Sequence, residues 1–223
     1  VEAISAKAIM TGLPWSWTGY GGYLDAVQKL KPALNIVGLV GDAAVRYDVM
    51  GDRAIDHDAV PTDDEIRDIA DRVRESVAAG AVGFSTSRLH GHALPDGRQM
   101  PGTFARMPEL RAIQQAVVEG GGQGAIFQFV PEINSLGRTL VEVLNGAEPE
   151  VLLDPTKTRE FLVMKDAVEA GCHVMFSGGA LPFGDGCVGI MEDFLASANV
   201  DERRITTLVH SRPSGSLLGL AQL

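Results

Sequence analysis

Five short apolar runs, separated by stretches with helical periodicity, constrain the fold of this chain more than any other feature. The runs are rich in β-branched or aromatic residues and are apolar at most positions, including successive ones. Such runs are typical of strands that are buried on both faces, as in parallel sheets. The predicted strands are Asn35–Gly41, Ala81–Thr86, Gly124–Val130, Cys172–Ser177 and Arg204–His210.

The segments between these runs carry helix start and stop signals. Thr62 and Glu65 are spaced as a capping box, and the helix they open is expected to end near Gly80. Pro108 is expected to open a second helix that the glycines at 120–122 close. Thr156 is expected to cap a third helix that ends at Gly171. An earlier helix around 23–27 stops at Lys31-Pro32, and a last one includes Met191, Phe194 and Leu195.

Repeated strand–helix units predict a parallel sheet with right-handed crossovers. An open doubly wound sheet and a β/α barrel both fit this pattern. No Gly-x-Gly-x-x-Gly sequence follows the first predicted strand, which disfavours a dinucleotide-binding sheet. A closed eight-stranded barrel needs about 250 residues, and this chain has 223. We therefore expect a single partial β/α-barrel domain over residues 1–223.

Composition excludes several classes of protein. The chain is 45% hydrophobic, which excludes general disorder, and has a net charge of −10 without a Lys/Arg cluster. We expect no nucleic-acid partner and no membrane partner, but a small-molecule substrate. The two cysteines, Cys172 and Cys187, are interpreted as reduced thiols of a cytoplasmic protein. No apolar run reaches the ~20 residues of a transmembrane helix, and Val1 is expected to continue a longer sequence.

Side chains just past the predicted strands are the candidate site residues, because working loops of β/α barrels lie at the carboxyl ends of the strands. The long loop at 91–102 lies at this end. His90 and His92 have the spacing of a metal chelate, but a third ligand is missing nearby, so contact with substrate or solvent is favoured. No Gly-x-Ser-x-Gly elbow supports a serine nucleophile. The predicted substrate-binding residues are Ser85, Ser87, Arg88, His90, Gln128, His210 and Arg212.

The two arginines in this set, Arg88 and Arg212, have two alternative roles. Each can hold a substrate carboxylate through paired hydrogen bonds, or each can form a surface or interface salt bridge. Asp42 and Glu132 are weaker candidates for the base of a metal-free hydrolase. The residues by themselves do not identify the catalytic group, which stays unassigned.

Four stretches carry a family resemblance. Ala79–Ala105, with GAVGFSTSR, DGR and PGTFA, is the most specific. The others are Val1–Val27 with LPWSWTGYGGYLDAV, Gly38–Arg53 with GLVGDAAVRYDVMGDR and Ser211–Leu220 with SRPSGSLLGL. In this order the chain resembles the N-acyl-D-amino-acid deacylase (D-aminoacylase) branch of the amidohydrolase superfamily. Residues 131–155 do not share in the resemblance.

The resemblance implies a partial (β/α)8 TIM barrel that supplies strands three to seven of a longer amidohydrolase chain. It also implies a hydrolase of non-peptide C–N (amide) bonds, with N-acyl-D-amino acids or related acylated amines as substrates. Zinc is the cofactor expected from the family, where it lowers the pKa of a bound water and polarises the carbonyl.

The family's zinc ligands are absent or replaced in this chain. Its first-strand His-x-His, second-strand cysteine and catalytic aspartate would lie outside these residues. Two further metal histidines align with Gln128 and Gly178, and an expected lysine with Ala180. A family tyrosine aligns with His90, and a frequent histidine with Asp42. The alternative interpretation is therefore a catalytically inactive or binding barrel.

Five parallel strands that do not close into a barrel expose two sheet edges. We therefore expect either self-association or flanking segments that complete the barrel. We expect these residues alone to be inactive.

Overall fold

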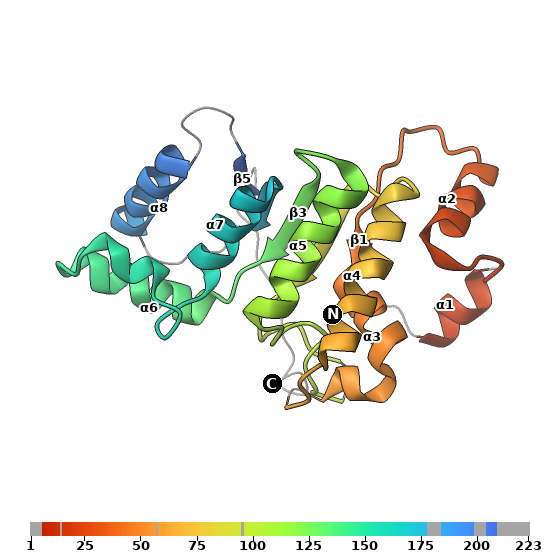
Figure 1. The fold of residues 1–223 in the computed structure, drawn as a ribbon, viewed down its shortest axis with the longest axis horizontal. Coiled ribbons are helices and arrows are strands. Elements are labelled where there is room, and N and C mark those ends of the chain that lie inside the picture. The colour runs from red at the N-terminus through yellow and green to blue at the C-terminus, as the bar shows by residue number, and fades with distance from the viewer. Residues whose placement is uncertain are drawn as a thin grey trace.

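The computed structural model describes residues 6–13, 15–56, 58–94, 96–177, 184–198 and 204–208, in which helices and strands alternate (Figure 1). The strands are β1 (Val40–Gly41), β2 (Gly83–Ser87), β3 (Ile126–Val130), β4 (His173–Ser177) and β5 (Ile205–Leu208). The helices are α1 (Ala6–Gly12), α2 (Gly19–Lys29), α3 (Asp42–Met50), α4 (Asp63–Ala78), α5 (Met107–Gly121), α6 (Ile133–Leu144), α7 (Glu160–Ala170) and α8 (Gly184–Ala198), with short 3-10 turns η1 (Gly51–Ile55) and η2 (Pro149–Leu153).

The five strands form one sheet in sequence order, and every neighbouring pair is parallel. Within the described residues, β1 and β5 are its edges. One register row runs from Ser85 through Gln128 and Met175 to Thr206. The prediction of five parallel β/α units, the partial-barrel fold class, is confirmed by this topology. The assignment of these strands as three to seven of a barrel stays a prediction.

One face of the sheet is completely covered by helices. Alternate strand residues point to the same side of a sheet. On this side lie four phenylalanines that are at most 1% exposed: Phe84, Phe127, Phe129 and Phe176. In Figure 1, α4, α5 and α7 stand side by side in front of the sheet, and neighbouring helices of this row pack against each other. The main hydrophobic core therefore lies between this face and the helices.

Helix ends follow most of the sequence signals. Thr62 accepts from the Glu65 backbone N–H and the Glu65 side chain accepts from the Thr62 backbone, so the capping box that begins α4 is confirmed. The glycines at 121 and 122 end α5, and Gly171 ends α7 in the left-handed region (φ +105°). The prediction for Thr156 is wrong, because α7 begins at Glu160 and residues 155–157 form a turn on Asp154.

The first strand is shorter than predicted. Only Val40 and Gly41 pair as a strand, and the preceding Ile36 and Val37 are 56% and 74% exposed. Within the part of the chain that the structure describes, the segment has a sheet neighbour on one side only. Most of the predicted run 35–41 therefore lacks there the two-sided burial that its apolar residues indicated. Helices α1, α3 and α6 were not predicted; α6 lies within the stretch that lacks the family resemblance.

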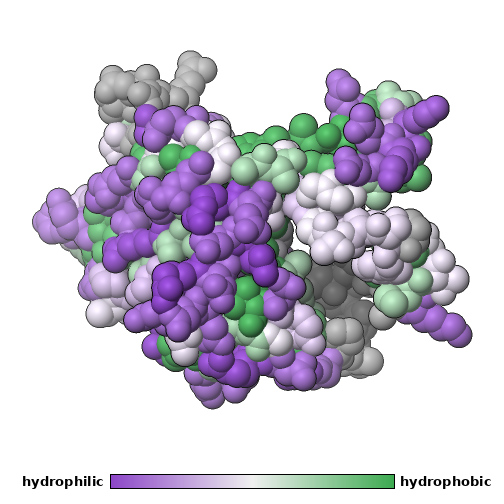
Figure 2. All heavy atoms as spheres, turned by 45° about the vertical axis from the view of Figure 1, so that its right-hand side comes forward, coloured by the Kyte–Doolittle hydropathy of each residue, from purple (hydrophilic) through white to green (hydrophobic). Residues whose placement is uncertain are grey.

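Hydrophilic residues dominate the surface in the view of Figure 2, in keeping with the net charge of −10. Among the described helices, none has the length and apolar character needed to cross a membrane.

Candidate active site

The sheet face opposite the helices carries a polar row. Ser85 and Gln128 are neighbours in the register and are half-buried. The Ser85 hydroxyl donates to Gln128 Oε1, which leaves the Gln128 amide N–H groups available as donors. In a β/α barrel this face points toward the barrel axis, and active sites lie where the strands end at their carboxyl termini. The structure thus brings two predicted site residues into direct contact.

Ser87, the last residue of β2, shares the face of Ser85 and forms a second polar pair. Its Oγ lies 2.6 Å from Nδ1 of His92, a residue of the loop that follows the strand. The backbone N–H of Leu89 also donates to Ser87 Oγ, at 3.3 Å. The hydroxyl is therefore held by both the imidazole and the turn. This arrangement places a hydroxyl and an imidazole at the carboxyl edge of the sheet.

Arg88 lies on the other side of the sheet. It has the parity of Phe84 and Thr86, and its side chain is buried. Its Nε donates to Glu160 Oε1 at 3.0 Å, and one terminal nitrogen donates to the Ala105 carbonyl at 3.0 Å. Of the two roles considered for this arginine, the structure shows the ion pair within the protein, in a buried rather than a surface form.

Asp42 belongs to the same helix-side layer. It is the first residue of α3, and Thr86 Oγ1 donates to its Oδ2 at 2.6 Å. Burial and the charge of Glu109 raise the pKa of Asp42 to about 7, against the opposing effects of the Thr86 hydrogen bond and the arginines. Gly102 (φ +93°) closes over it, since a Cβ there would lie 2.0 Å from Asp42 Oδ2. A carboxyl enclosed in this way is not placed to act on a substrate.

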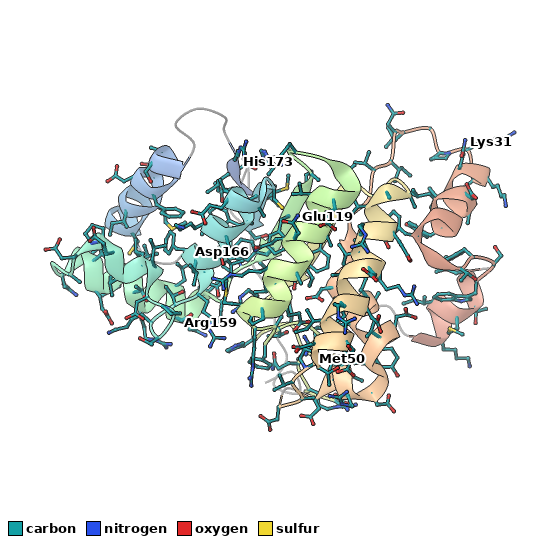
Figure 3. The ribbon with its side chains drawn as sticks, viewed as in Figure 1. Lys31, Met50, Glu119, Arg159, Asp166 and His173 are labelled. Carbon is teal, nitrogen blue, oxygen red and sulfur yellow. The ribbon has the colours of Figure 1, made fainter. Side chains whose placement is uncertain are left out.

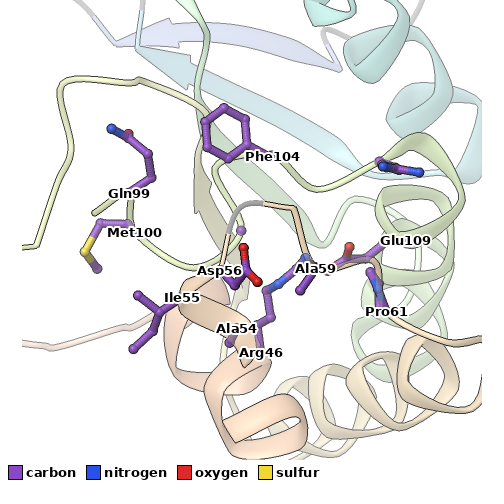
Figure 4. Close-up of a pocket in the computed structure, with 12 residues that line it drawn as sticks. Arg46, Ala54, Ile55, Asp56, Ala59, Pro61, Gln99, Met100, Phe104 and Glu109 are labelled. Atoms are coloured by element: carbon purple, nitrogen blue, oxygen red, sulfur yellow. Dashed lines mark hydrogen bonds and ion pairs between the residues drawn. The ribbon is translucent and has the colours of Figure 1, made fainter. Parts of the chain in front are cut away.

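A buried ion pair completes this layer. Arg46 donates to Glu109, and both side chains are at most 7% exposed. Figure 4 shows the guanidinium of Arg46 directed from α3 toward Glu109 of α5. The cavity beside the pair has a volume of about 20 Å³, roughly the space of a single water molecule. It is too small for an acylated amino acid, so this cluster is structural.

Two further candidates, His90 and Glu132, lie beside each other at the strand ends. The exposed His90 ring packs on Phe104, with ring centroids 5.1 Å apart. Burial acts to raise the pKa of Glu132, but hydrogen bonds from Ser135 and Asn134 outweigh it and lower the pKa. Glu132 is thus the N-cap of α6, and both of its carboxylate oxygens accept backbone N–H groups. This engagement and the lowered pKa make it a poor proton acceptor for the role of base considered from the sequence.

The remaining predicted positions cannot be placed. His210 and Arg212, and the aligned positions Gly178 and Ala180, lie outside the described residues. Within the part of the chain that the structure describes, no three His, Cys, Asp or Glu side chains converge as a metal site. Gln128, aligned with a family ligand, directs its oxygen to Ser85. The described residues therefore do not fit a zinc ion by themselves.

Sequence reasoning missed Glu109 and Glu160, the buried partners of the two arginines. Both are at the first turn of a helix, where acidic residues are common, so the pattern gave no sign of burial. The side taken by Arg88 carried a signal, because it continues the parity of Phe84 and Thr86 on β2. Cys172 is buried and burial raises its thiol pKa to about 12, so it is not a nucleophile.

Comparisons with known proteins give relatives of unassigned function and one solved structure. No family model matches the chain. Uncharacterised proteins of Mycobacterium tuberculosis (strains H37Rv and CDC 1551) and of Mycobacterium bovis are 28% identical to it over 143 residues, or 60% of this chain. The chain spans 23% of the length of these curated relatives.

The solved structure is similar over a larger part of the chain. It is the N-acyl-D-glutamate deacylase of Bordetella bronchiseptica, complexed with zinc and a phosphonate inhibitor that mimics the tetrahedral intermediate. The TM-score is 0.59 at 19% sequence identity, and the match covers 87% of this chain and 34% of the deacylase chain. This likeness shows a shared fold.

Proposed function

We propose that this chain is part of an amidohydrolase-type enzyme that hydrolyses non-peptide C–N (amide) bonds, with N-acyl-D-amino acids or related acylated amines as substrates. The observation that carries the proposal is the polar row at the carboxyl edge of a sheet whose fold is shared with a deacylase. The domain 1–223 would then be one segment of a longer barrel chain. The fraction of the relatives that it spans supports this part of the proposal.

The polar row supplies groups that an acylated amine needs. The Gln128 amide N–H groups can donate to a carbonyl or carboxylate oxygen, because the Oε1 is already engaged by Ser85. His92 and Ser87 form a pair that can pass a proton to or from a group bound at the strand end. These residues bind, orient and exchange protons with the substrate in this proposal, and His210 and Arg212 are expected to join them.

Turnover by the full-length gene product tests the proposal. A panel of N-acetyl-D-amino acids and their L-enantiomers is incubated with the enzyme, and free amine is measured before and after treatment with a chelator. We expect release from at least one D-substrate in preference to its enantiomer. Release that continues after chelation would argue for a metal-free mechanism, and no release across the whole panel would remove the deacylase proposal.

A matched pair of variants links the activity to the polar row. Ser87→Ala removes the hydroxyl that meets His92, and Ser76→Ala removes a hydroxyl that donates only to a carbonyl within α4. We expect kcat to fall at least tenfold for the first and to stay unchanged for the second. Equal activity of the two variants would exclude a role for Ser87.

The second candidate function is a binding barrel without catalysis. It is favoured by one observation: Gln128, which aligns with a family metal ligand, is hydrogen-bonded to Ser85. Metal analysis of the purified full-length protein separates the two candidates. Less than one-tenth equivalent of zinc, together with binding but no hydrolysis of the acylated amino acids, would support the binding barrel. Stoichiometric zinc with turnover would exclude it.

A further inference from the structure

A second hollow at the strand ends is lined by three arginines that have no carboxylate partner among the described residues. Its volume is about 600 Å³, which lies in the range of small-molecule pockets. It lies between the β2–α5 loop, the start of α6 and the start of α7. Arg106, Arg138 and Arg159 contribute exposed side chains to its wall. Figure 3 shows Arg159 at the end of α7 away from His173, which begins β4.

The pairing of these arginines differs from that of the rest of the chain. Eight other arginines of the described residues form ion pairs with carboxylates: Arg46, Arg53, Arg67, Arg72, Arg74, Arg88, Arg98 and Arg111. In the same described residues, Arg106, Arg138 and Arg159 form no ion pair and donate no side-chain hydrogen bond. Three unpaired guanidinium groups around one pocket thus occur in a protein of net charge −10.

The acidic residues of the pocket do not neutralise these arginines. Glu160 is paired with Arg88, and Glu132 accepts backbone N–H groups at the start of α6. Counting all charged side chains of the wall, four arginines and two glutamates leave two net positive charges. A bound dianion would balance this charge, and guanidinium groups bind oxyanions by paired hydrogen bonds.

Helix geometry adds to the positive potential. Arg106 and Arg159 are the N-cap residues of α5 and α7, and neither helix has a side-chain cap at this end. The partial positive charges of both helix N-termini therefore face the same region as the guanidinium groups. The Ser135 and Thr158 side chains also line the pocket and offer hydroxyl donors.

One wall is suited to the carbon skeleton of an organic ligand. Phe104 packs on His90 there, and both rings border the pocket. A simple inorganic ion would leave most of this volume of about 600 Å³ unfilled.

From these observations we infer that the hollow is a binding site for a small organic dianion, such as a dicarboxylate or a phosphate ester, held by Arg106, Arg138 and Arg159. The site lies outside the polar row of Ser85 and Gln128, on the helix side of the sheet. It does not depend on the proposed deacylase activity, because it requires only binding.

Calorimetric titration of the full-length protein tests this inference. Succinate, glycerol 3-phosphate and inorganic phosphate are titrated at constant ionic strength, with the neutral succinamide as a control ligand. We expect one of the two organic dianions to bind in the micromolar to low millimolar range and succinamide not to bind. The ligand that binds with the lower dissociation constant, succinate or glycerol 3-phosphate, shows whether the site prefers a dicarboxylate or a phosphate ester. Binding of inorganic phosphate alone would overturn the organic ligand, and no binding of any anion would overturn the site.

Charge-matched variants locate the binding. Arg138→Gln and Arg159→Gln should each weaken binding of the preferred dianion about tenfold or more, since each removes a charged donor. Arg67→Gln removes the same charge from an exposed arginine paired with Asp64 on α4, and should leave the affinity within about twofold. Equal weakening by all three variants would indicate a general charge effect and would overturn the assignment to this pocket. Loss of deacylase turnover without a change in anion binding would concern only the polar row.

Discussion

The two faces of the sheet differ in how deeply their side chains are buried among the described residues. On the helix side, aromatic side chains are enclosed, and buried charges meet partners from neighbouring elements, as Arg88 meets Glu160. On the opposite side, Ser85, Gln128 and Ser87 are half-buried and hydrogen-bond within a polar row. The difference teaches that one sheet has an enclosed apolar face and a partly exposed polar face, and our proposal assigns substrate binding to the second.

The largest effect is expected from adjacent residues on opposite faces of β3. Phe127→Ala removes an aromatic ring that is 0% exposed and should lower the free energy of unfolding by about 3–5 kcal/mol. Gln128→Ala removes one side-chain hydrogen bond, with Ser85, and should cost about 1 kcal/mol or less. Chemical denaturation of the two variants measures this contrast. Equal losses would contradict the division between the faces.

Breaking a buried charge pair on the helix side should have an effect of similar or slightly smaller size. Arg88→Met leaves Glu160 buried without its cation and should lower the free energy of unfolding by about 3 kcal/mol. The control is Arg98→Met, which breaks an exposed pair with Asp96 and should change stability by less than about 1 kcal/mol. Thermal or denaturant unfolding measures both, and a small effect of Arg88→Met would mean that the pair is open to solvent.

The helix-side cluster also predicts a dependence of stability on pH. Two arginines, Arg46 and Arg88, balance Glu109 and Glu160, so an ionised Asp42 adds an unbalanced charge. Its pKa is raised from 3.8 to about 7 in the folded protein. Between these two pH values the folded state keeps the proton while the unfolded state loses it. The contribution of Asp42 to the free energy of unfolding therefore falls as the pH rises from about 4 to 7, by up to about 4 kcal/mol.

Asp42→Asn removes this titration. The variant should lack this component of the pH dependence and should gain stability relative to the wild type between pH 5 and pH 8. Urea denaturation at the two pH values measures the difference. A stability difference between wild type and variant that stays constant from pH 5 to pH 8 would show that Asp42 is already ionised in the fold over this range.

The smallest effect is expected from two glycines in the loop that covers Asp42. Comparing them separates the cost of backbone strain from the cost of steric crowding. Gly102 and Gly97 both have positive φ values, +93° and +86°, but only Gly102 lies against Asp42. A Cβ at Gly97 meets nothing within 4 Å. Gly102→Ala should therefore cost about 1–3 kcal/mol more than Gly97→Ala. Equal melting temperatures of the two variants would mean that the loop does not close over Asp42.

Much of the fold was predictable from the sequence, because β2, β3 and β4 coincide with apolar runs that can be recognised locally. The helices between them carry local end signals, such as the capping residue Thr62. The edge strand was not, since the pairing of residues 35–39 depends on neighbours that the local sequence does not reveal. The site was predictable in part. Ser85, Ser87 and Gln128 gather on one face, as their strand-end positions indicated.

Arg88 could not be assigned between its two roles from residue type, since a guanidinium suits both a substrate carboxylate and a buried glutamate. The choice depends on Glu160, 72 residues away in sequence. The cluster of Arg106, Arg138 and Arg159 was likewise invisible, because it joins the starts of two helices and one face of a third. Contacts between distant segments are what the sequence pattern lacks.

The most direct test of the account measures kcat/KM and the melting temperature of the full-length Gln128→Ala variant on the D-substrate that the wild type prefers. If Gln128 binds the substrate, the variant should lose at least about 100-fold in kcat/KM. Its melting temperature should stay within a few degrees of that of the wild type. Unchanged kcat/KM, or a loss that appears only together with unfolding, would contradict the assignment of this face to substrate binding.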